Sequence, residues 1–217
     1  MSTRNTIIFA IVLITGSLLA GVLLWDRFPN QMASHWNIND QVDGTMSRFW
    51  GVFILPVITT GMLLLFMIFP MIDPLKANIA KFRPIFNLFI VLIILFMTYI
   101  WTLTIFWNLG STNFKMSSAM LPAIGLLFLF LGYLLRKAKR NWFIGIRTPW
   151  TLSSDRVWDE THRLGSVLFY VCAILALAGS LFGSYSFWFV IIPTLSVSLF
   201  LIVYSYFAYR REQGVNV

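Results

Sequence analysis

The side chains of this sequence that could do chemistry are concentrated in two polar segments, and the richer of the two is residues 136–163. Within it, His162 follows Asp159 by three residues, so both could share one face of a helix, and Arg147 could act with them at the cytoplasmic interface. Such a set would suit an enzyme that acts on lipid head groups at a membrane surface. No nucleophile and no phosphate-binding spacing completes the set. We therefore expect no enzyme, and a structural hydrogen bond from His162 beside Trp158.

The second segment, residues 26–48, contains potential metal ligands. His35, Asp40 and Asp43 are ordinary ligand types, but one histidine and two loop carboxylates have no diagnostic spacing. The single cysteine, Cys172, excludes an intramolecular disulfide and a cysteine-based metal site, and it is expected to be a small core residue. We therefore expect neither a metal nor a cofactor.

The composition is that of a membrane protein. Hydrophobic residues make up 59% of the chain, charged residues make up 11%, and the mean hydropathy is +0.80, far from the values of a soluble domain. A helix needs about 20 apolar residues to cross the bilayer core. The last uncharged stretch, Leu164–Tyr209, is long enough for two spans with a turn at Gly179–Ser186. We expect an all-α polytopic protein with a single membrane domain over 1–217. The six expected spans are 5–25, 49–72, 84–108, 116–135, 164–182 and 187–209.

Basic residues indicate how these spans are oriented. The net charge is +8, and thirteen of the sixteen Lys and Arg residues fall on one side of the expected topology, Arg27, Arg48 and Lys115 being the exceptions. Cytoplasmic loops carry the excess of basic residues. Both termini and the inner loop, 136–163, are therefore expected in the cytoplasm, and the outer loop, 26–48, outside. The first span is expected to stay uncleaved, because no small-residue cleavage site follows it.

The outer loop is long enough to hold a site. Its composition predicts one turn at Pro29–Asn30 and another at Asp43–Gly44. Between them, Trp36 could anchor at the membrane interface while His35 and Asn37 tie the loop together by hydrogen bonds. Alternatively, the loop meets an extracellular ligand. The candidate residues for such a ligand are His35, Trp36, Asn37, Asp43 and Gly44.

The inner loop contains a run that membrane anchoring alone would not require, Arg147–Thr151. In this run Pro149 forces an extended conformation on the residue before it. Arg147 is the expected polar contact of a docking surface, because its guanidinium can pair with a carboxylate, and Trp150 is the expected buried anchor. The candidate residues for binding a cytoplasmic partner are Asn141, Gly145, Arg147, Thr148, Pro149, Trp150, Thr151, Trp158, His162 and Arg163.

The rest of the inner loop predicts a helix. Ser153 is the best placed N-cap, and Asp155 is favourable in the first turn. Opposite charges then recur four residues apart, in the pairs Arg156–Glu160 and Asp159–Arg163. We therefore expect a short amphipathic helix over Asp155–Arg163 that lies at the membrane interface and leads into the fifth span.

Both loops carry long and unusual motifs. The outer motif comprises Pro29, His35–Asn37, Val42–Gly44 and Ser47–Phe49. The inner motif comprises Asn141, Phe143, Gly145–Ser154, Trp158, Thr161–Arg163 and Gly165. Together they resemble the two signatures of the SdpI family, the membrane immunity proteins for sporulation-delaying-type peptide toxins. The resemblance extends over nearly the whole chain, and the inner motif makes it specific.

This resemblance implies two roles for a multi-pass protein of a prokaryotic plasma membrane. One is protection of the cell from a secreted, membrane-active peptide toxin. The other is capture of a winged-helix repressor at the cytoplasmic surface, without direct binding of nucleic acid. Membrane lipids are the remaining expected partners. Two alternatives stay open, a small-molecule or ion transporter and a membrane enzyme at the lipid interface. A transporter would normally carry ionisable groups inside its spans, and the expected spans contain none.

Overall fold

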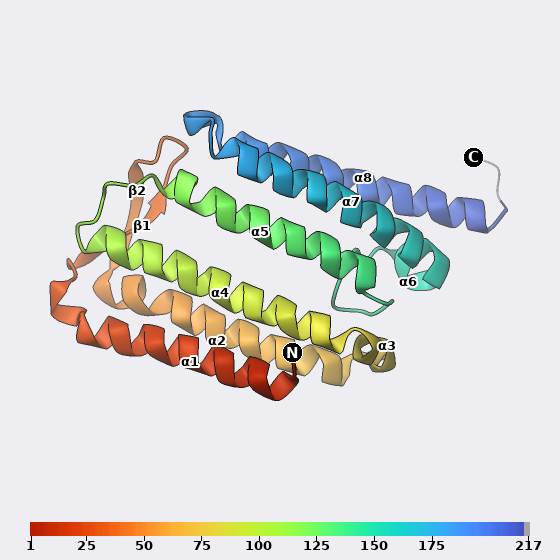
Figure 1. The fold of residues 1–217 in the computed structure, drawn as a ribbon, viewed down its shortest axis with the longest axis horizontal. Helices are drawn as coiled ribbons and strands as arrows, with labels where there is room; N and C mark the ends of the chain where they lie inside the picture. The colour runs from red at the N-terminus through yellow and green to blue at the C-terminus, as the bar shows by residue number, and fades with distance from the viewer. Residues whose placement is uncertain (215–217) are drawn as a thin grey trace.

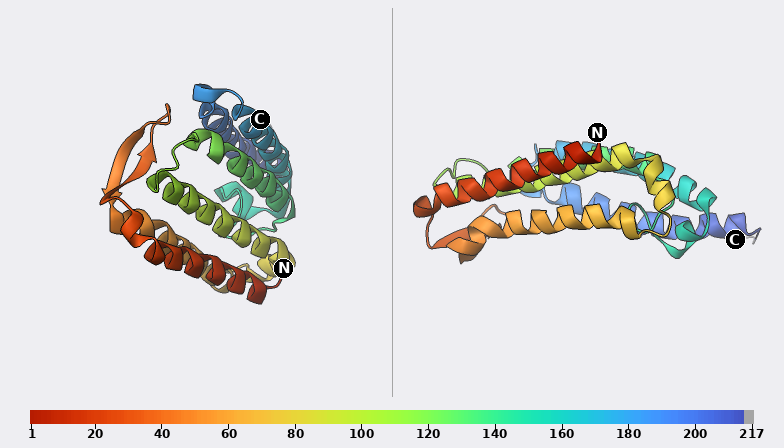
Figure 2. Two further views of the ribbon diagram at one scale, coloured as in Figure 1. Left: turned by 60° about the vertical axis from the view of Figure 1, so that its left-hand side comes forward. Right: turned by 90° about the horizontal axis from the view of Figure 1, so that it is seen from below.

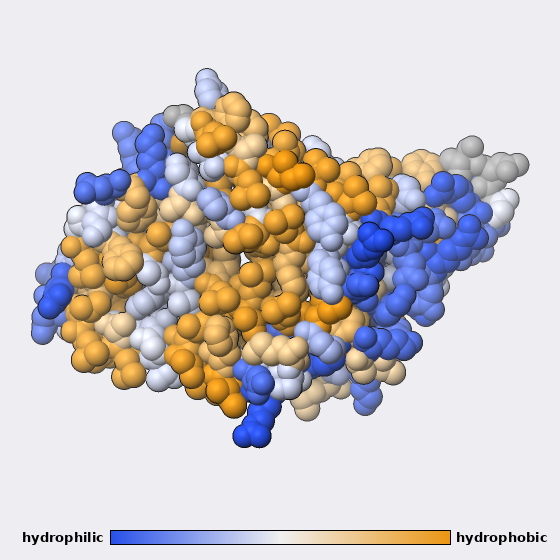
Figure 3. Space-filling view, in the orientation of Figure 1, coloured by the Kyte–Doolittle hydropathy of each residue, from blue (hydrophilic) through white to orange (hydrophobic). Residues whose placement is uncertain are grey.

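The computed structural model describes residues 1–214 as a bundle of long helices with small elements at its two ends (Figure 1). Within these residues six helices are long and apolar enough to cross a membrane, which confirms the predicted all-α polytopic class. Hydrophobic side chains cover the middle of the bundle and hydrophilic ones gather toward its ends (Figure 3), as a multi-pass protein of the cell membrane requires. The six helices are α1 (Thr3–Leu23), α2 (Arg48–Ile72), α4 (Arg83–Asn108), α5 (Met116–Lys137), α7 (Asp155–Gly179) and α8 (Trp188–Glu212).

The short elements define the two ends of the bundle. A hairpin of two strands lies at one end, which we name the outer end, and α3 and α6 lie at the other, the inner end (Figure 1). Helix α1 begins and α8 ends toward the inner end. The short elements are η1 (Trp25–Arg27), β1 (Gln31–Trp36), β2 (Val42–Ser47), α3 (Lys76–Lys81), α6 (Pro149–Ser153) and η2 (Gly183–Tyr185).

Helix α4 is the centre of the packing. Its residues Phe86, Ile90 and Ile94 are fully buried and share one apolar cluster with Ala10 of α1 and Leu63 of α2. Seen from below, α1 and α4 lie in one layer and α2 in another (Figure 2, right). A second cluster joins α5 to α7.

In the second cluster, Phe128 of α5 packs with Cys172, Ala173 and Ala176 of α7. Small side chains let two membrane helices approach closely, which is favourable where lipid cannot supply a hydrophobic driving force. Cys172 is a free, buried thiol, so its expected role as a small core residue is confirmed.

The outer loop contains an antiparallel hairpin that the sequence did not predict. The turn expected at Asp43–Gly44 is wrong, because these residues lie within β2 and the chain reverses at Asn37–Gln41 instead. The strands are short, and their register is interrupted around His35 by a bulge. Asn108, at the end of α4, fixes the hairpin: its side chain accepts a hydrogen bond from the Ala33 N–H (2.8 Å) and donates one to the Ala33 carbonyl (3.0 Å). The hairpin is therefore attached to the membrane helices rather than free above them.

The expected interfacial helix over Asp155–Arg163 is wrong as a separate element. These residues form the first turns of α7, which continues without a break to Gly179. Its N-cap is Ser154, whose hydroxyl accepts a hydrogen bond from the Val157 N–H, whereas Ser153 closes α6 by donating to Pro149. No residue between Arg163 and Ser166 ends the helix. The amphipathic turns over Asp155–Arg163 and the fifth span therefore form one continuous helix.

One of the two expected ion pairs on α7 forms. Arg156 contacts Glu160 at 3.0 Å. Asp159 does not pair with Arg163; its carboxylate instead contacts Lys139, in the segment after α5, at 3.3 Å. The start of α7 is thus held both by one charge pair on its own surface and by the neighbouring segment after α5.

Candidate binding sites at the two ends of the bundle

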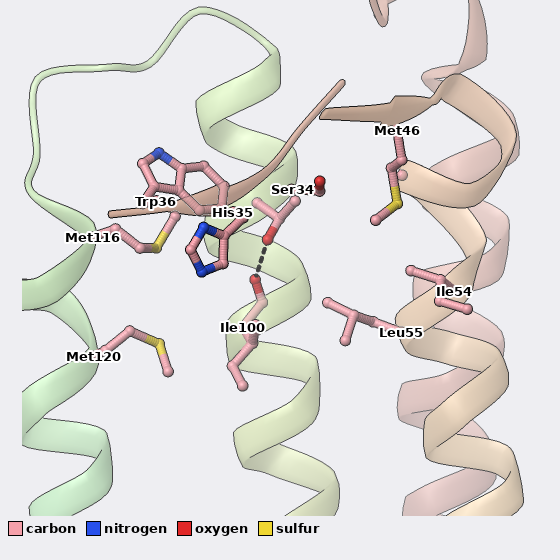
Figure 4. Close-up of a pocket in the computed structure, with 11 residues that line it drawn as sticks. Ser34, His35, Trp36, Met46, Ile54, Leu55, Ile100, Met116 and Met120 are labelled. Carbon is pink, nitrogen blue, oxygen red and sulfur yellow. Dashed lines mark hydrogen bonds between the residues drawn. The ribbon is translucent and has the colours of Figure 1, made fainter. Parts of the chain in front are cut away.

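Two cavities lie beneath the hairpin at the outer end. The first, of about 330 Å³, has His35 and Trp36 of β1 above it, Met116 and Met120 of α5 on one side, and α2 on the other (Figure 4). The second, of about 450 Å³, is lined by the same four side chains and extends to the hairpin turn. The walls of the first cavity are completed by Ser34, Met46, Gly51, Ile54, Leu55, Ile100 and Thr104. We call this pair of spaces the outer cavities.

Polar side chains at the rim of the outer cavities come from both strands. The Nδ1 of His35 lies 2.5 Å from Oδ1 of Asp43, and the His35 side chain is 70% exposed. Gly44 faces the same histidine, and a Cβ at Gly44 would lie 2.9 Å from the Cβ of His35. Trp36 and Trp107 pack in a T-shaped arrangement, with ring centroids 5.5 Å apart. The five outer candidate residues therefore lie together, with Gly44 as the one that makes room for His35.

The hairpin turn is held by two side chains. Asn37 accepts hydrogen bonds from the backbone N–H groups of Asn39 (2.9 Å) and Gln41 (3.1 Å). Asp40 accepts from the N–H (2.7 Å) and the hydroxyl (2.6 Å) of Ser117, at the start of α5. Because Asp40 is engaged with Ser117, it does not join His35 and Asp43. Among residues 1–214, no group of three or more His, Cys, Asp and Glu side chains is arranged to hold a metal ion.

At the inner end, Asn141 organises the loop that follows α5. Its side-chain amide donates to the carbonyls of Lys139 (2.8 Å) and Ile144 (2.9 Å), and its carbonyl oxygen accepts from the N–H groups of Phe143 (2.9 Å) and Ile144 (2.7 Å). Asn141 is completely buried. It therefore replaces the hydrogen bonds that a helix or sheet would otherwise supply to these backbone groups.

Gly145, Trp158 and His162 form a second buried unit of the inner motif. The Nδ1–H of His162 donates to the Trp158 carbonyl (2.8 Å), and its Nε2 accepts from the Ile146 N–H (3.0 Å). The imidazole and indole rings stack, with centroids 3.9 Å apart. Gly145 has a φ of +115° and leaves room for the imidazole, since a Cβ there would lie 2.4 Å from Nε2. His162 is thus the structural hydrogen-bonding residue expected from the sequence.

Thr148 and Thr151 are also internal. They form a capping box at the start of α6, and the Thr148 hydroxyl lies 2.9 Å from that of Ser205 on α8. Trp150 packs edge-on against Tyr206 of α8, with centroids 5.1 Å apart, and is half-buried. Trp150 is therefore anchored to its own chain.

The inner candidate residues divide into buried and exposed ones. Asn141, Thr148, Thr151, Trp158 and His162 are buried. Arg147, Pro149 and Arg163 are exposed. Gly145 and Trp150 are intermediate, so the exposed side chains that a partner in solution can contact are those of these three candidates and of the neighbouring Trp142.

The residues of the possible enzyme site do not assemble. His162 uses both ring nitrogens for backbone groups, Asp159 contacts Lys139, and Arg147 donates to the Trp142 carbonyl at 3.1 Å. None of these contacts joins the three side chains to one another. Each of the three side chains has its own structural contact instead.

A third cavity, of about 330 Å³, lies at the inner end, and we call it the inner cavity. Residues of four membrane helices form its walls, and Phe143, Ile144, Gly145, Ile146 and Arg147 of the inner loop complete it. The Phe143 ring stacks on Phe69 of α2, with centroids 4.5 Å apart. The helical residues are Phe66, Phe69, Phe89, Leu131, Leu134, Leu135 and Phe169.

Several residues at these sites were missed by sequence reasoning. Asp73 is buried after α2; it accepts from the Trp142 N–H at 2.9 Å and so ties the inner loop to the short loop before α3. Met116, Met120 and Ser117 complete the outer site from α5. Asp73 stands out only because its carboxylate is buried in a short loop. A single sequence does not show which loop residues are buried, so Asp73 could not be recognised from it.

Comparisons with known proteins agree with the two motifs. The model of the SdpI/YfhL protein family matches residues 137–205, and a domain of unknown function (DUF1648) matches residues 12–60. Immunity protein SdpI of Bacillus subtilis (strain 168) is 26% identical over 209 residues, which are 95% of this chain and 97% of that protein. No solved structure matches the chain. The first match contains the whole inner motif, and the second contains the hairpin. The chain is therefore a multi-pass membrane protein whose residues 137–205 are similar to the SdpI/YfhL protein family.

Proposed function

We propose that this protein protects its cell from a secreted peptide toxin by binding the toxin at its outer end. The observation that carries the proposal is similarity over nearly the full length of both chains to a protein named Immunity protein SdpI. The excess of basic residues at the inner end supports an orientation with the inner loop and both termini in the cytoplasm. The hairpin would then face the medium from which the toxin arrives.

The outer cavities are the proposed toxin site. Their walls are mainly aliphatic, aromatic and methionine side chains, and methionine adapts well to irregular apolar partners. The exposed His35 and Asp43 add polar groups at the rim. A membrane-active peptide carries apolar side chains of the size that such cavities accept, and polar groups that the rim can bind.

Filling the outer cavities is expected to abolish much of the protection. A sensitive strain that expresses the protein should survive a sporulation-delaying-type peptide toxin, whereas one that expresses Met120→Trp should tolerate far less. Met120 lines both outer cavities, so an indole there would occupy the space proposed for the toxin. Loss of an anchor contact typically weakens binding about 30-fold, or ~2 kcal/mol, and the tolerated toxin concentration should fall by a similar factor.

The matched control is Leu129→Trp on the same helix. Leu129 is 37% exposed and lines neither outer cavity, so this variant should protect as well as the wild type at equal membrane accumulation. Full protection by a well-accumulated Met120→Trp protein would exclude the outer cavities as the toxin site. Absence of protection by the wild type would exclude the immunity function itself.

The same cells test the orientation and the mode of protection. In a Cys172→Ser background, Asn39→Cys should react with a membrane-impermeant thiol reagent in intact cells, and Ser153→Cys only after permeabilisation; both positions are exposed. Toxin recovered from protected cells should be intact, because protection by binding leaves it unaltered. Cleaved or modified toxin would favour the enzyme alternative, and toxin expelled from the cell would favour a transporter.

We further propose that the inner end captures a winged-helix repressor through its exposed side chains, Trp142, Arg147, Pro149 and Arg163. Tryptophan and arginine dominate interface hot spots, and Trp142 is 51% exposed in a membrane protein that offers little polar surface. The buried residues of the inner motif would contribute by keeping this surface folded.

Removal of the exposed indole should separate repressor capture from immunity. Trp142→Ala is expected to lower co-purification of the winged-helix repressor about tenfold or more, while membrane accumulation and toxin tolerance stay normal. Trp50, which is 50% exposed at the outer end, provides the matched control, and Trp50→Ala should capture the repressor normally. Capture unchanged by Trp142→Ala would remove this surface as the docking site.

A further inference from the structure

We propose that the inner cavity is a binding site for one anionic phospholipid, with its phosphate on Arg147 and part of an acyl chain between the membrane helices. This inference does not depend on the immunity function. It follows from the cavity's lining, from the free charge at its edge and from its depth along the helices.

The lining of the inner cavity is apolar except at one point. Its helical walls consist entirely of phenylalanine and leucine side chains, and the inner loop adds Phe143, Ile144 and Ile146. Arg147 is the one charged residue of the lining. An occupant that matches these walls has to be apolar along its length and anionic at one end.

The charge of Arg147 has no carboxylate partner among residues 1–214. Two other basic side chains of this region are paired, Lys139 with Asp159 at 3.3 Å and Arg140 with Asp155 at 2.7 Å, whereas Arg147 is the unpaired one that lines the cavity. The single hydrogen bond from Arg147 goes to a backbone carbonyl, that of Trp142. The remaining N–H groups of its exposed guanidinium are available to a phosphate, which this planar fork binds in a paired geometry.

The depth of the cavity fits a lipid. Phe66 of α2, Phe89 of α4 and Leu131 of α5 lie within about two helical turns, or ~11 Å, of the inner ends of their helices. The head group of a phospholipid lies at the helix ends, and its acyl chains run toward the bilayer centre. Basic pockets between membrane helices are known to hold anionic lipid head groups in this way. Charge, shape and depth therefore agree on one class of occupant.

The test uses the purified full-length protein in detergent, titrated with phosphatidylglycerol or with phosphatidylcholine and followed by native mass spectrometry. The wild type should bind one phosphatidylglycerol more tightly than phosphatidylcholine. Arg147→Gln should weaken phosphatidylglycerol binding about fivefold, the typical contribution of one basic residue near an anionic lipid, and should weaken phosphatidylcholine binding less, because the choline cation already offsets the charge of that phosphate. Arg136→Gln removes the same charge from an exposed position outside the cavity, and it should have no such effect.

A second variant tests the acyl-chain half of the site. Leu131→Trp keeps Arg147 but fills the cavity, and it should weaken binding of both lipids, whereas inorganic phosphate at millimolar concentration should not displace phosphatidylglycerol. Equal losses for Arg147→Gln and Arg136→Gln would show a diffuse basic surface and overturn the proposal. Unchanged lipid binding by Leu131→Trp, in a protein that melts like the wild type, would overturn it as well. So would displacement of the lipid by free phosphate.

Discussion

Replacing Asn141 with alanine is expected to cause the largest loss of stability of any single polar substitution in the inner loop. The side chain serves four hydrogen bonds with backbone groups of Lys139, Phe143 and Ile144, and it is completely buried. A buried backbone group left without a partner costs about 1–3 kcal/mol. Allowing for partial rescue by water, we expect a loss of ~3–5 kcal/mol. The variant should accumulate poorly in the membrane and melt at a much lower apparent temperature in detergent.

Asn37 supplies a matched control for this prediction. It holds the outer turn in a similar way, by accepting from two backbone N–H groups, but these bonds are exposed to solvent. Water can replace the amide there, so Asn37→Ala should cost less than about 1 kcal/mol. If Asn141→Ala accumulates and melts like the wild type but no longer retains the repressor, then Asn141 is a docking residue and the stability argument is wrong.

The membrane helices could be predicted from the sequence because one requirement, that backbone hydrogen bonds be satisfied inside the bilayer, determines where they form. A backbone inside the bilayer must satisfy its own hydrogen bonds, so long uncharged stretches become helices regardless of their neighbours. Helices α1, α2, α4 and α5 begin or end within a few residues of the expected spans. The start of α7 was harder to predict from the sequence. The pattern of Asp155–Arg163 fits a separate interfacial helix as well as it fits the first turns of a membrane span.

The hairpin could not be predicted because its stability is not local. The strands are short, and what holds them are the contacts of Ala33 with Asn108 and of Asp40 with Ser117, each between residues more than seventy positions apart. Such pairs have no signature in a single sequence. The composition of the outer loop indicated a turn at Asp43–Gly44, but the bulged register places these residues in β2 and the turn at Asn37–Gln41.

The inner motif shows why an unusual sequence does not by itself identify a binding surface. Its aromatic and turn residues suggested recognition, yet Asn141, Thr151 and Trp158 are buried and bind their own chain. A loop without regular structure needs side chains to satisfy its backbone, and that need selects the same residue types as recognition does. Arg147 was predicted to make a polar contact with a cytoplasmic partner. Its guanidinium is exposed, so this stays a prediction.

Replacing Gly145 with alanine is expected to disrupt the other buried unit of the inner loop. Its φ of +115° lies where residues with a side chain are strained, at a typical cost of about 1–3 kcal/mol. The added Cβ would lie 2.4 Å from Nε2 of His162 and 3.3 Å from the Trp158 ring. The imidazole would have to move away from the Ile146 N–H, which would lose its partner. We expect a total loss of ~3 kcal/mol or more, measured as a lower apparent melting temperature and lower membrane accumulation.

Gly110 separates the two contributions to that loss. Its φ is +97°, similar to that of Gly145, but nothing lies within 4 Å of the position that a Cβ would take. Gly110→Ala therefore measures the backbone strain alone, about 1 kcal/mol or slightly more, and should leave the protein folded. If both variants lose the same stability, then the contact with His162 contributes nothing. If Gly145→Ala is the more damaged of the two, the stacked histidine and indole depend on the absence of a side chain at this position, and the conformation of the exposed Arg147 two residues later depends on it too.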